Sequence, residues 1–156
     1  MQVHRNIDDL PLFRKAVITI GTFDGVHLGH QRIIHQMKAE ANVCGGETVI
    51  LTFHPHPRKV VNGSKHEISL LNSMEEKITL LSAHGIDHLV VIPFTDQFSK
   101  MSAREYVSHF LVGKFHPYKP IIGYDHRFGN DRMGNYELLE EMETIAASGT
   151  KLNLDY

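Results

Sequence analysis

The residues of this chain best suited to chemistry lie in one turn, between residues 20 and 30. The stretch reads IGTFDGVHLGH and carries three glycines and two histidines, His27 and His30. Glycine lets the backbone approach a ligand closely and adopt a positive φ. Histidines three residues apart share one face on the first turn of a helix, where their rings can donate hydrogen bonds or, when protonated, offset negative charge. The pattern predicts a cradle for a nucleotide phosphate, with His27 and His30 as the catalytic candidates.

A strand and a helix have to position this turn. The β-branched run 16–20 precedes it and predicts a strand buried on both faces. A helix ended by Gly45 and Gly46 should follow, and its free N–H groups and positive dipole end suit an anion. The buried stripe of that helix is predicted to contain Ile33, Met37, Ala41 and Cys44.

The rest of the chain alternates between strands and helices. Capping boxes at Ser73–Glu76 and Ser102–Glu105 predict two helices, and Asn135 can cap a third, with Leu138, Met142 and Ile145 inward and Gly149 at its end. Residues 1–15 are predicted to form an arm that leads into the sheet, and the prolines of 54–59 predict a loop. Further strands are predicted at 48–53, 88–92, 119–123 and 151–156.

This alternation predicts an α/β fold. We expect a Rossmann-like, doubly wound, mostly parallel sheet of about five strands flanked by helices. In such sheets, ligands bind beyond the carboxyl ends of the strands, where the strand order reverses. The glycine-rich turn lies at one of these strand ends.

Charge and composition exclude several classes of protein. The formal net charge is −2, from 18 acidic and 16 basic residues, so nucleic acid is not indicated as a partner. The single cysteine, Cys44, excludes a disulfide within the chain and favours a reducing compartment. No apolar run approaches the length that spans a membrane, and the start lacks the apolar segment of a signal peptide. We therefore expect a cytoplasmic protein with no membrane partner.

The residues of the turn also carry a resemblance to a known family. The four residues His27-Leu28-Gly29-His30 are similar to the HxGH signature of the nucleotidyltransferase superfamily. More narrowly, residues 21–30 resemble the bacterial FAD synthetase family, whose members are bifunctional riboflavin kinase/FMN adenylyltransferases. Three further motifs of this family are matched in order by residues 52–57, 94–103 and 123–129, with Gly134 beyond the last.

The resemblance implies transfer of AMP from ATP to FMN, which releases pyrophosphate and gives FAD. ATP and FMN would be the ligands, with Mg²⁺ on the triphosphate and no metal held by the protein alone. Family members usually continue into a Ser-Ser-Thr…Arg motif and a riboflavin kinase barrel. We therefore expect residues 1–156 to be an FMN adenylyltransferase domain without kinase activity.

The resemblance also implies which residues form the site. Residues expected against the nucleotide are Gly21, Thr22, Phe23, Asp24, Gly25 and Gly29. In family terms, the loop around Asp125, Phe128 and Gly129 lies near flavin and nucleotide, and Pro55 of the second motif is a further candidate. Charge and loop position alone make Arg58, Arg127 and Arg132 candidate phosphate partners.

Alternative interpretations remain open from the sequence. The chain could bind flavin or nucleotide without turnover, or could be another HxGH nucleotidyltransferase with a different phosphorylated acceptor. A zinc site formed by His27, His30, His54 and His56 is a third reading, although no common zinc-binding pattern is present. The side chains of Phe94, Phe98 and Met101 could line a flavin ring, but core packing is the favoured interpretation.

Overall fold

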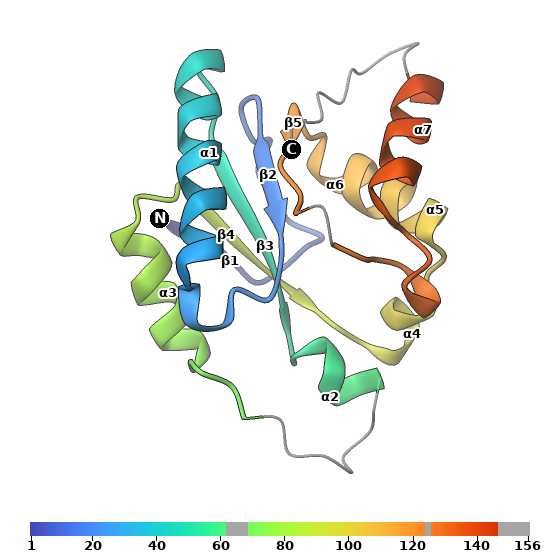
Figure 1. The fold of residues 1–156 in the computed structure, drawn as a ribbon, viewed down its shortest axis with the longest axis horizontal. Helices are drawn as coiled ribbons and strands as arrows, with labels where there is room; N and C mark the ends of the chain where they lie inside the picture. Colours follow the sequence, from blue (N-terminus) through green and yellow to red (C-terminus); the bar gives the residue numbers. More distant parts are fainter. Residues whose placement is uncertain (62–68, 124–125, 147–156) are drawn as a thin grey trace.

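A five-stranded parallel sheet forms the centre of the computed structural model, which describes residues 1–61, 69–123 and 126–146 (the last five by backbone alone) (Figure 1). The strand order is β1-β4-β3-β2-β5, and every described pair is parallel. The strands are β1 Gln2–His4, β2 Val17–Ile20, β3 Thr48–His54, β4 His88–Pro93 and β5 Lys119–Pro120.

Helices connect these strands and cover the sheet. The α-helices are α1 Leu28–Cys44, α2 Pro57–Val61, α3 Met74–Ala83, α4 Asp96–Ser99, α5 Ala103–Glu105, α6 Gly113–Phe115 and α7 Tyr136–Ala146. Two 3₁₀ turns, η1 Asp24–Val26 and η4 Asn130–Arg132, lie in the loops after β2 and β5. A π-helical segment, η3 Tyr106–Val112, joins α5 to α6 without a break.

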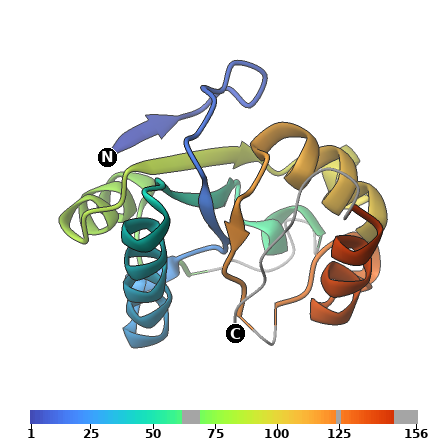
Figure 2. The same cartoon turned by 90° about the horizontal axis from the view of Figure 1, so that it is seen from above.

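Alternate strand residues build two hydrophobic cores, one on each face of the sheet. Helices α1 and α3 lie on one side in Figure 1, where Ile34, Met37 and Leu81 pack on residues such as Val17 and Ile50. The continuous helix 103–115 and α7 lie on the other side, a separation that Figure 2 also shows.

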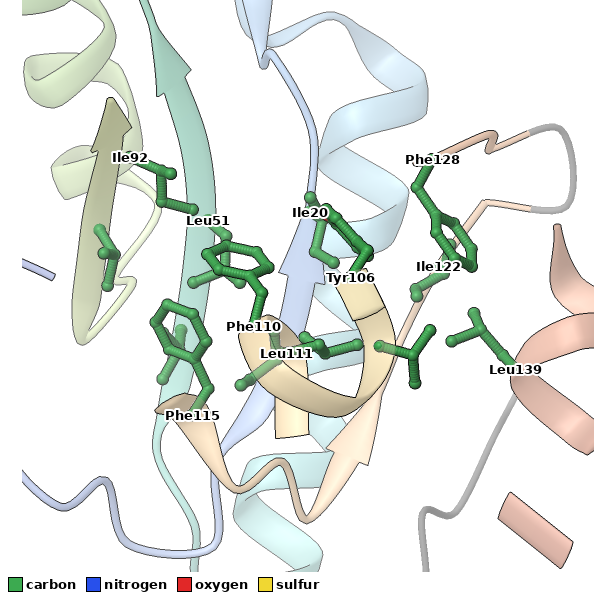
Figure 3. Close-up of a cluster of buried hydrophobic side chains, with 14 of the residues drawn as sticks. Ile20, Leu51, Ile92, Tyr106, Phe110, Leu111, Phe115, Ile122, Phe128 and Leu139 are labelled. Carbon is green, nitrogen blue, oxygen red and sulfur yellow. The ribbon is translucent and has the colours of Figure 1, made fainter. Parts of the chain in front are cut away.

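The second core is the more aromatic of the two. Figure 3 shows Phe110, Leu111 and Phe115 directed toward strand residues such as Ile20 and Leu51. Both sheet faces are therefore covered, which explains why the three inner strands, β2, β3 and β4, are nearly continuous apolar runs.

The strand order reverses at β2. From β2 the chain moves outward through β3 to β4, and then returns to place β5 on the other side of β2. Helix α1 leaves β2 on one face, and the helix before β5 lies on the opposite face. The reversal opens a crevice at the carboxyl end of β2, where ligands bind in folds of this type.

The predicted fold class is confirmed, and so are the helix starts. Both capping boxes form: the Ser73 hydroxyl accepts from the Glu76 N–H at 3.1 Å, and that of Ser102 accepts from the Glu105 N–H at 3.3 Å. The side chain of Asn135 accepts a hydrogen bond from the N–H of Leu138 at 2.9 Å. These starts were predictable because each depends on residues three positions apart.

Several predicted details are wrong. The segment 1–15 is more than an arm, because Gln2–His4 pairs with β4 as an edge strand. The segment 54–59 is not wholly a loop, since α2 begins at Pro57, where a missing N–H costs nothing. The strand predicted at 119–123 is shortened to β5 and a single bridge at Ile121.

One inward position in each of two helices is also shifted by one residue, whereas Met37 and Ala41 of α1 are buried as predicted. Ile34 is 1% exposed on α1, whereas Ile33 is only partly buried, and Leu139 rather than Leu138 is the fully buried leucine of α7. The strand predicted at 151–156 and Gly149 lie outside the described residues, as do the side chains of Met142 and Ile145. The fifth strand of the described sheet is instead β1.

The packing predicts a large cost for truncating Leu111, which is fully buried in the aromatic core. Leu111→Ala should lower the free energy of unfolding by about 2–5 kcal/mol, because it leaves a cavity between η3 and the sheet. Urea unfolding would measure this. Leu12→Ala, at a residue that is 91% exposed, is the control and should change stability by less than about 0.5 kcal/mol. Equal effects of the two substitutions would contradict the packing described here.

Candidate active site

A cleft of about 830 Å³ opens at the carboxyl end of β2 and gathers all four segments that sequence analysis singled out. The turn after β2 contributes Gly21, Thr22 and Phe23, and α1 contributes His30. The other three segments supply Phe53 and Arg58, Phe94 and Phe98, and Phe128 and Gly129. Residues as far apart in the sequence as Ile20 and Arg132 therefore line one cavity.

Hydrogen bonds to the segment before α3 hold the turn in place. The carboxylate of Asp24 accepts from the backbone N–H of Leu71 at 2.9 Å and from that of Asn72 at 3.1 Å. The N–H of Gly25 donates to the side-chain oxygen of Asn72 at 2.7 Å. Gly25 has a φ of 77°, and a Cβ there would lie 2.7 Å from Leu71 Cδ1. Asp24 and Gly25 therefore fasten the turn and do not line the large cleft.

The two histidines form a stack at the start of α1. The ring centroids of His27 and His30 are 3.7 Å apart with an interplanar angle of 23°, and Phe23 lies on the other side of His30 at 4.6 Å. His27 is exposed, whereas His30 is partly buried and lines the cleft. The Nδ1 atom of His30 is buried and has no hydrogen-bond partner among the described residues.

The environment of His30 disfavours its cationic form. Burial, followed by the neighbouring His27, lowers the pKa of His30 from 6.5 to about 4, against an opposing effect of Asp24. His30 is therefore neutral near pH 7. A neutral imidazole donates one hydrogen bond and accepts another, so the ring can orient a phosphate oxygen without carrying a charge.

Three phenylalanines form one wall of the cleft. The ring of Phe94 lies 5.4 Å from those of both Phe53 and Phe98, centroid to centroid. Phe98 also contacts Phe110 of the core at 5.0 Å, and Met101 packs against the same core. Phe94 and Phe98 thus have one side in the cleft, whereas Met101 belongs to the core and does not line the cleft.

A second part of the cleft wall comes from the loop after β5. The ring of Phe128 stacks on Tyr106 at 5.0 Å and 25°. Two backbone hydrogen bonds between Phe128 and Gly134, at 3.2 and 2.8 Å, close this loop. Gly129 has a φ of 75°, and a Cβ there would lie 2.6 Å from the Cα of Ala103. Gly129 therefore lets the loop pack closely on the start of α5, and the pairing with Gly134 holds Phe128 at the cleft.

Basic side chains outnumber acidic ones around the cleft. The cations among the described lining residues are Arg58, Lys100, Arg127 and Arg132, and the carboxylates are Asp96 and Asp131. The carboxylate of Asp96 already accepts from Lys100 Nζ at 2.6 Å. This excess of positive charge suits a ligand with several phosphate groups.

The structure separates the predicted site residues into two groups. Those that line the cleft are Gly21, Thr22, Phe23, His30, Arg58, Arg127, Phe128, Gly129 and Arg132. Those that do not are His27, Asp24, Gly25, Gly29 and Pro55. Asp125 lies outside the described residues.

Sequence reasoning missed several lining residues. Tyr106 was not recognised because an aromatic residue on an apolar helix stripe is more often core. Phe53 and His56 also line the cleft. They lie within residues 52–57, and the match of that segment to a family motif was the signal that could have identified them. Lys77, which is buried beside the turn, gave no signal because a lysine after two glutamates is typical of a solvated helix face.

Two further features, a metal-binding cluster and a membrane-spanning helix, are absent from the described residues. No group of three or more His, Cys, Asp or Glu side chains is arranged there to hold a metal ion. The helices of the same part of the chain include none long and apolar enough to cross a membrane.

The family model and the relatives that match this chain carry agreeing descriptions. The family model described as FAD synthetase matches residues 10–152. A bifunctional riboflavin kinase/FMN adenylyltransferase from Listeria monocytogenes is 37% identical, over 76% of this chain and 37% of its own. One of the same name from Buchnera aphidicola subsp. Schizaphis graminum is 34% identical, over 91% and 46% respectively. The chain thus spans less than half the length of these two relatives.

A solved structure supports the fold. A macrolide-efflux protein from Streptococcus pneumoniae superposes with a TM-score of 0.80, covering 98% of this chain and 50% of that one. Its sequence identity is 20%, so the likeness concerns the fold alone.

Because His30 is partly buried, we expect the free energy of unfolding to depend on pH. Because its pKa is lowered from 6.5 to about 4, the unfolded chain binds more protons here than the folded protein between these values. The free energy of unfolding should therefore fall as the pH falls through this window, and His30→Asn should make that fall less steep. Urea unfolding at several pH values would measure the slope.

His35→Asn, at an exposed position of the same helix, controls for the loss of one histidine. Equal slopes in His30→Asn and the unsubstituted protein would show that His30 is not desolvated.

Proposed function

This chain belongs to the FAD synthetase family, and on that premise we propose that it is a nucleotidyltransferase of FAD biosynthesis that transfers the adenylyl group of ATP to FMN. A phosphate oxygen of FMN attacks the α-phosphorus of ATP. The bond between that phosphorus and the bridging oxygen to the β-phosphate breaks, and pyrophosphate leaves. The proposal covers this step alone, with residues 1–156 as one adenylyltransferase domain.

The observation that carries the proposal is the convergence of four separate segments on one cationic cleft. An anionic phosphate is already a nucleophile near neutral pH, so no side chain has to remove a proton. The protein has to align two anionic substrates and stabilise the charge on the α-phosphate and the departing pyrophosphate. The guanidinium groups of arginine suit this task because they pair with phosphate oxygens. So do the free N–H groups at the start of α1.

The histidine stack has a specific part in this proposal. His30 is neutral near pH 7 and faces the cleft, so it would donate a hydrogen bond to a phosphate oxygen. His27 covers the other side of that ring and would limit its movement. The two roles differ: His30 contacts substrate, and His27 mainly positions His30.

The aromatic walls suit the flavin. A flat ring system in the cleft would meet aromatic side chains from two segments, Phe94 and Phe98 from one and Phe128 from the other. Stacking and edge contacts with aromatic side chains favour such a ligand. The walls therefore support FMN as the acceptor.

Magnesium would enter as part of the ATP substrate. The cleft offers few oxygen ligands, since Asp96 is bound by Lys100 and Asp131 is the other carboxylate among the described lining residues. Mg²⁺ is commonly held by phosphates and water with one or two carboxylates, so this donor set fits an ion carried on the triphosphate. The use of ATP and FMN, together with the single cysteine, favours the cytoplasm as the location.

The direct test is turnover with the proposed substrates. The protein should release pyrophosphate and form FAD when given ATP, Mg²⁺ and FMN, and His30→Ala should lower kcat by about 100-fold through loss of a preorganised donor. Coupled pyrophosphate detection and chromatography of FAD would measure both. His35→Ala is the matched control. Turnover with another phosphorylated acceptor but not FMN would overturn the substrate assignment.

A second prediction concerns phosphate binding. Arg58 lines the cleft, so Arg58→Gln should raise the KM for ATP or FMN by about tenfold, since a charge-assisted hydrogen bond contributes about 1.5–3 kcal/mol. Arg104→Gln removes an exposed arginine whose partner is Glu141, outside the cleft. If both variants keep the KM values of the unsubstituted protein, Arg58 is not a phosphate ligand.

A further inference from the structure

Lys77 is the only charged residue with a buried side chain in the part of the chain that the structure describes. It lies on α3 and is 8% exposed. Lysine is almost never this buried unless it is paired, because removing an ammonium group from water is costly. No carboxylate of the described residues lies within 4.0 Å of its Nζ. The fold therefore retains a buried charge that has no close ion pair among the described residues. A contribution to stability does not explain why it is there.

The contacts of Lys77 lead to the turn at the cleft. Its Nζ donates to the hydroxyl of Thr52, at 3.5 Å, and that hydroxyl donates to the carbonyl oxygen of Thr22, at 3.2 Å. Thr52 is fully buried near the end of β3, and Thr22 lines the large cleft. A chain of two hydrogen bonds thus connects α3, through β3, to the turn after β2.

A second, smaller cavity is lined by Lys77 together with His54 and His56. This cavity of about 340 Å³ shares Phe53 and His56 with the large cleft. The charged or titratable groups that line it are Arg5, Asp24, His54, His56, Glu75 and Lys77. Asp24 uses its carboxylate to accept the N–H groups of Leu71 and Asn72, so it only partly compensates the ammonium.

The charge of Lys77 reaches residues of the large cleft. The positive charge of Lys77 helps to lower the pKa of both His30 and His56. Its effect on each ring is smaller than that of burial and of other neighbouring groups. Burial in turn lowers the pKa of Lys77, and Asp24 opposes that effect. The groups that act on His30 therefore come from the residue before α1 (His27), from the turn (Asp24) and from α3 (Lys77).

We propose that Lys77 is a positioning residue for the adenylyl-transfer site: its buried ammonium group fixes the phosphate-binding turn through Thr52 and places a positive charge behind the wall that faces the substrate phosphates. This inference rests on the proposed function. A positive charge held in a buried, rigid place needs no reorganisation when negative charge develops on the phosphates. Lys77 acts through the turn and His30, and does not itself contact substrate.

The test is Lys77→Met, which keeps an unbranched side chain one heavy atom shorter and removes the charge. Asp24 keeps its N–H partners in this variant, so no buried charge is left unpaired. The urea midpoint should equal or exceed that of the unsubstituted protein, while kcat/KM for FAD formation falls at least about tenfold. The pKa of His30, followed by NMR of its ring protons, should rise because the lysine charge that lowers it is gone. Lys38→Met is the control, since Lys38 is an exposed lysine of α1 that bonds to the end of α3.

A second variant covers the case in which Lys77→Met does not fold. Thr52→Val removes the hydroxyl that links Lys77 to Thr22 and conserves the volume of the side chain. Thr52→Val should lower kcat/KM, as Lys77→Met does. An unchanged kcat/KM would overturn the proposal. So would full activity of a folded Lys77→Met protein, or an unchanged pKa of His30 in it. If the unsubstituted protein forms no FAD, the proposed function fails, whereas the His30 titration still decides whether Lys77 acts on that ring.

Discussion

The arrangement of the whole site depends on the fastening of one turn, in which the carboxylate of Asp24 accepts the N–H groups of Leu71 and Asn72. This carboxylate joins the end of β2 to the segment that opens α3, although 47 residues separate the two in the sequence. A charge-assisted hydrogen bond of this kind is roughly twice as strong as a neutral one, so it suits a turn that has to stay rigid. The glycine at position 25 allows the backbone to follow, since its φ of 77° is one that other residues rarely adopt.

A rigid turn matters because the chemistry proposed here is mainly a matter of alignment. His30 is held between His27 and Phe23, so its ring has little freedom to rotate. The same enclosure keeps the ring neutral near pH 7, because a buried imidazole loses the solvation of its charged form. Positive charge is supplied instead by the side chains around the rim of the cleft and, on the proposal made here, by Lys77 behind its wall.

Much of this could be predicted from the sequence where the signals are local. Ser73 and Glu76 marked the start of α3 because capping needs residues three positions apart. The apolar run 48–53 marked β3 because a strand covered on both faces has to be apolar throughout. The strand Gln2–His4 was missed because a short edge strand buries little and shows no run of this kind. Ile34 and Leu139 were missed by one residue because helical periodicity identifies a face more reliably than it identifies the residue at the centre of that face.

The sequence by itself determined the fold class, the family and the glycine-rich turn with His27 and His30, because these depend on residues close together or on motifs in a set order. Only the tertiary structure decided which candidates share the cleft, for example that Arg58 and Phe128 line it whereas Asp24 fastens the turn behind it. It also decided that Lys77 is buried while its neighbours on α3, Glu75 and Glu76, are exposed. The reason is that burial and charge environment are set by strand order and by the packing of elements distant in the sequence, and no local pattern carries that information.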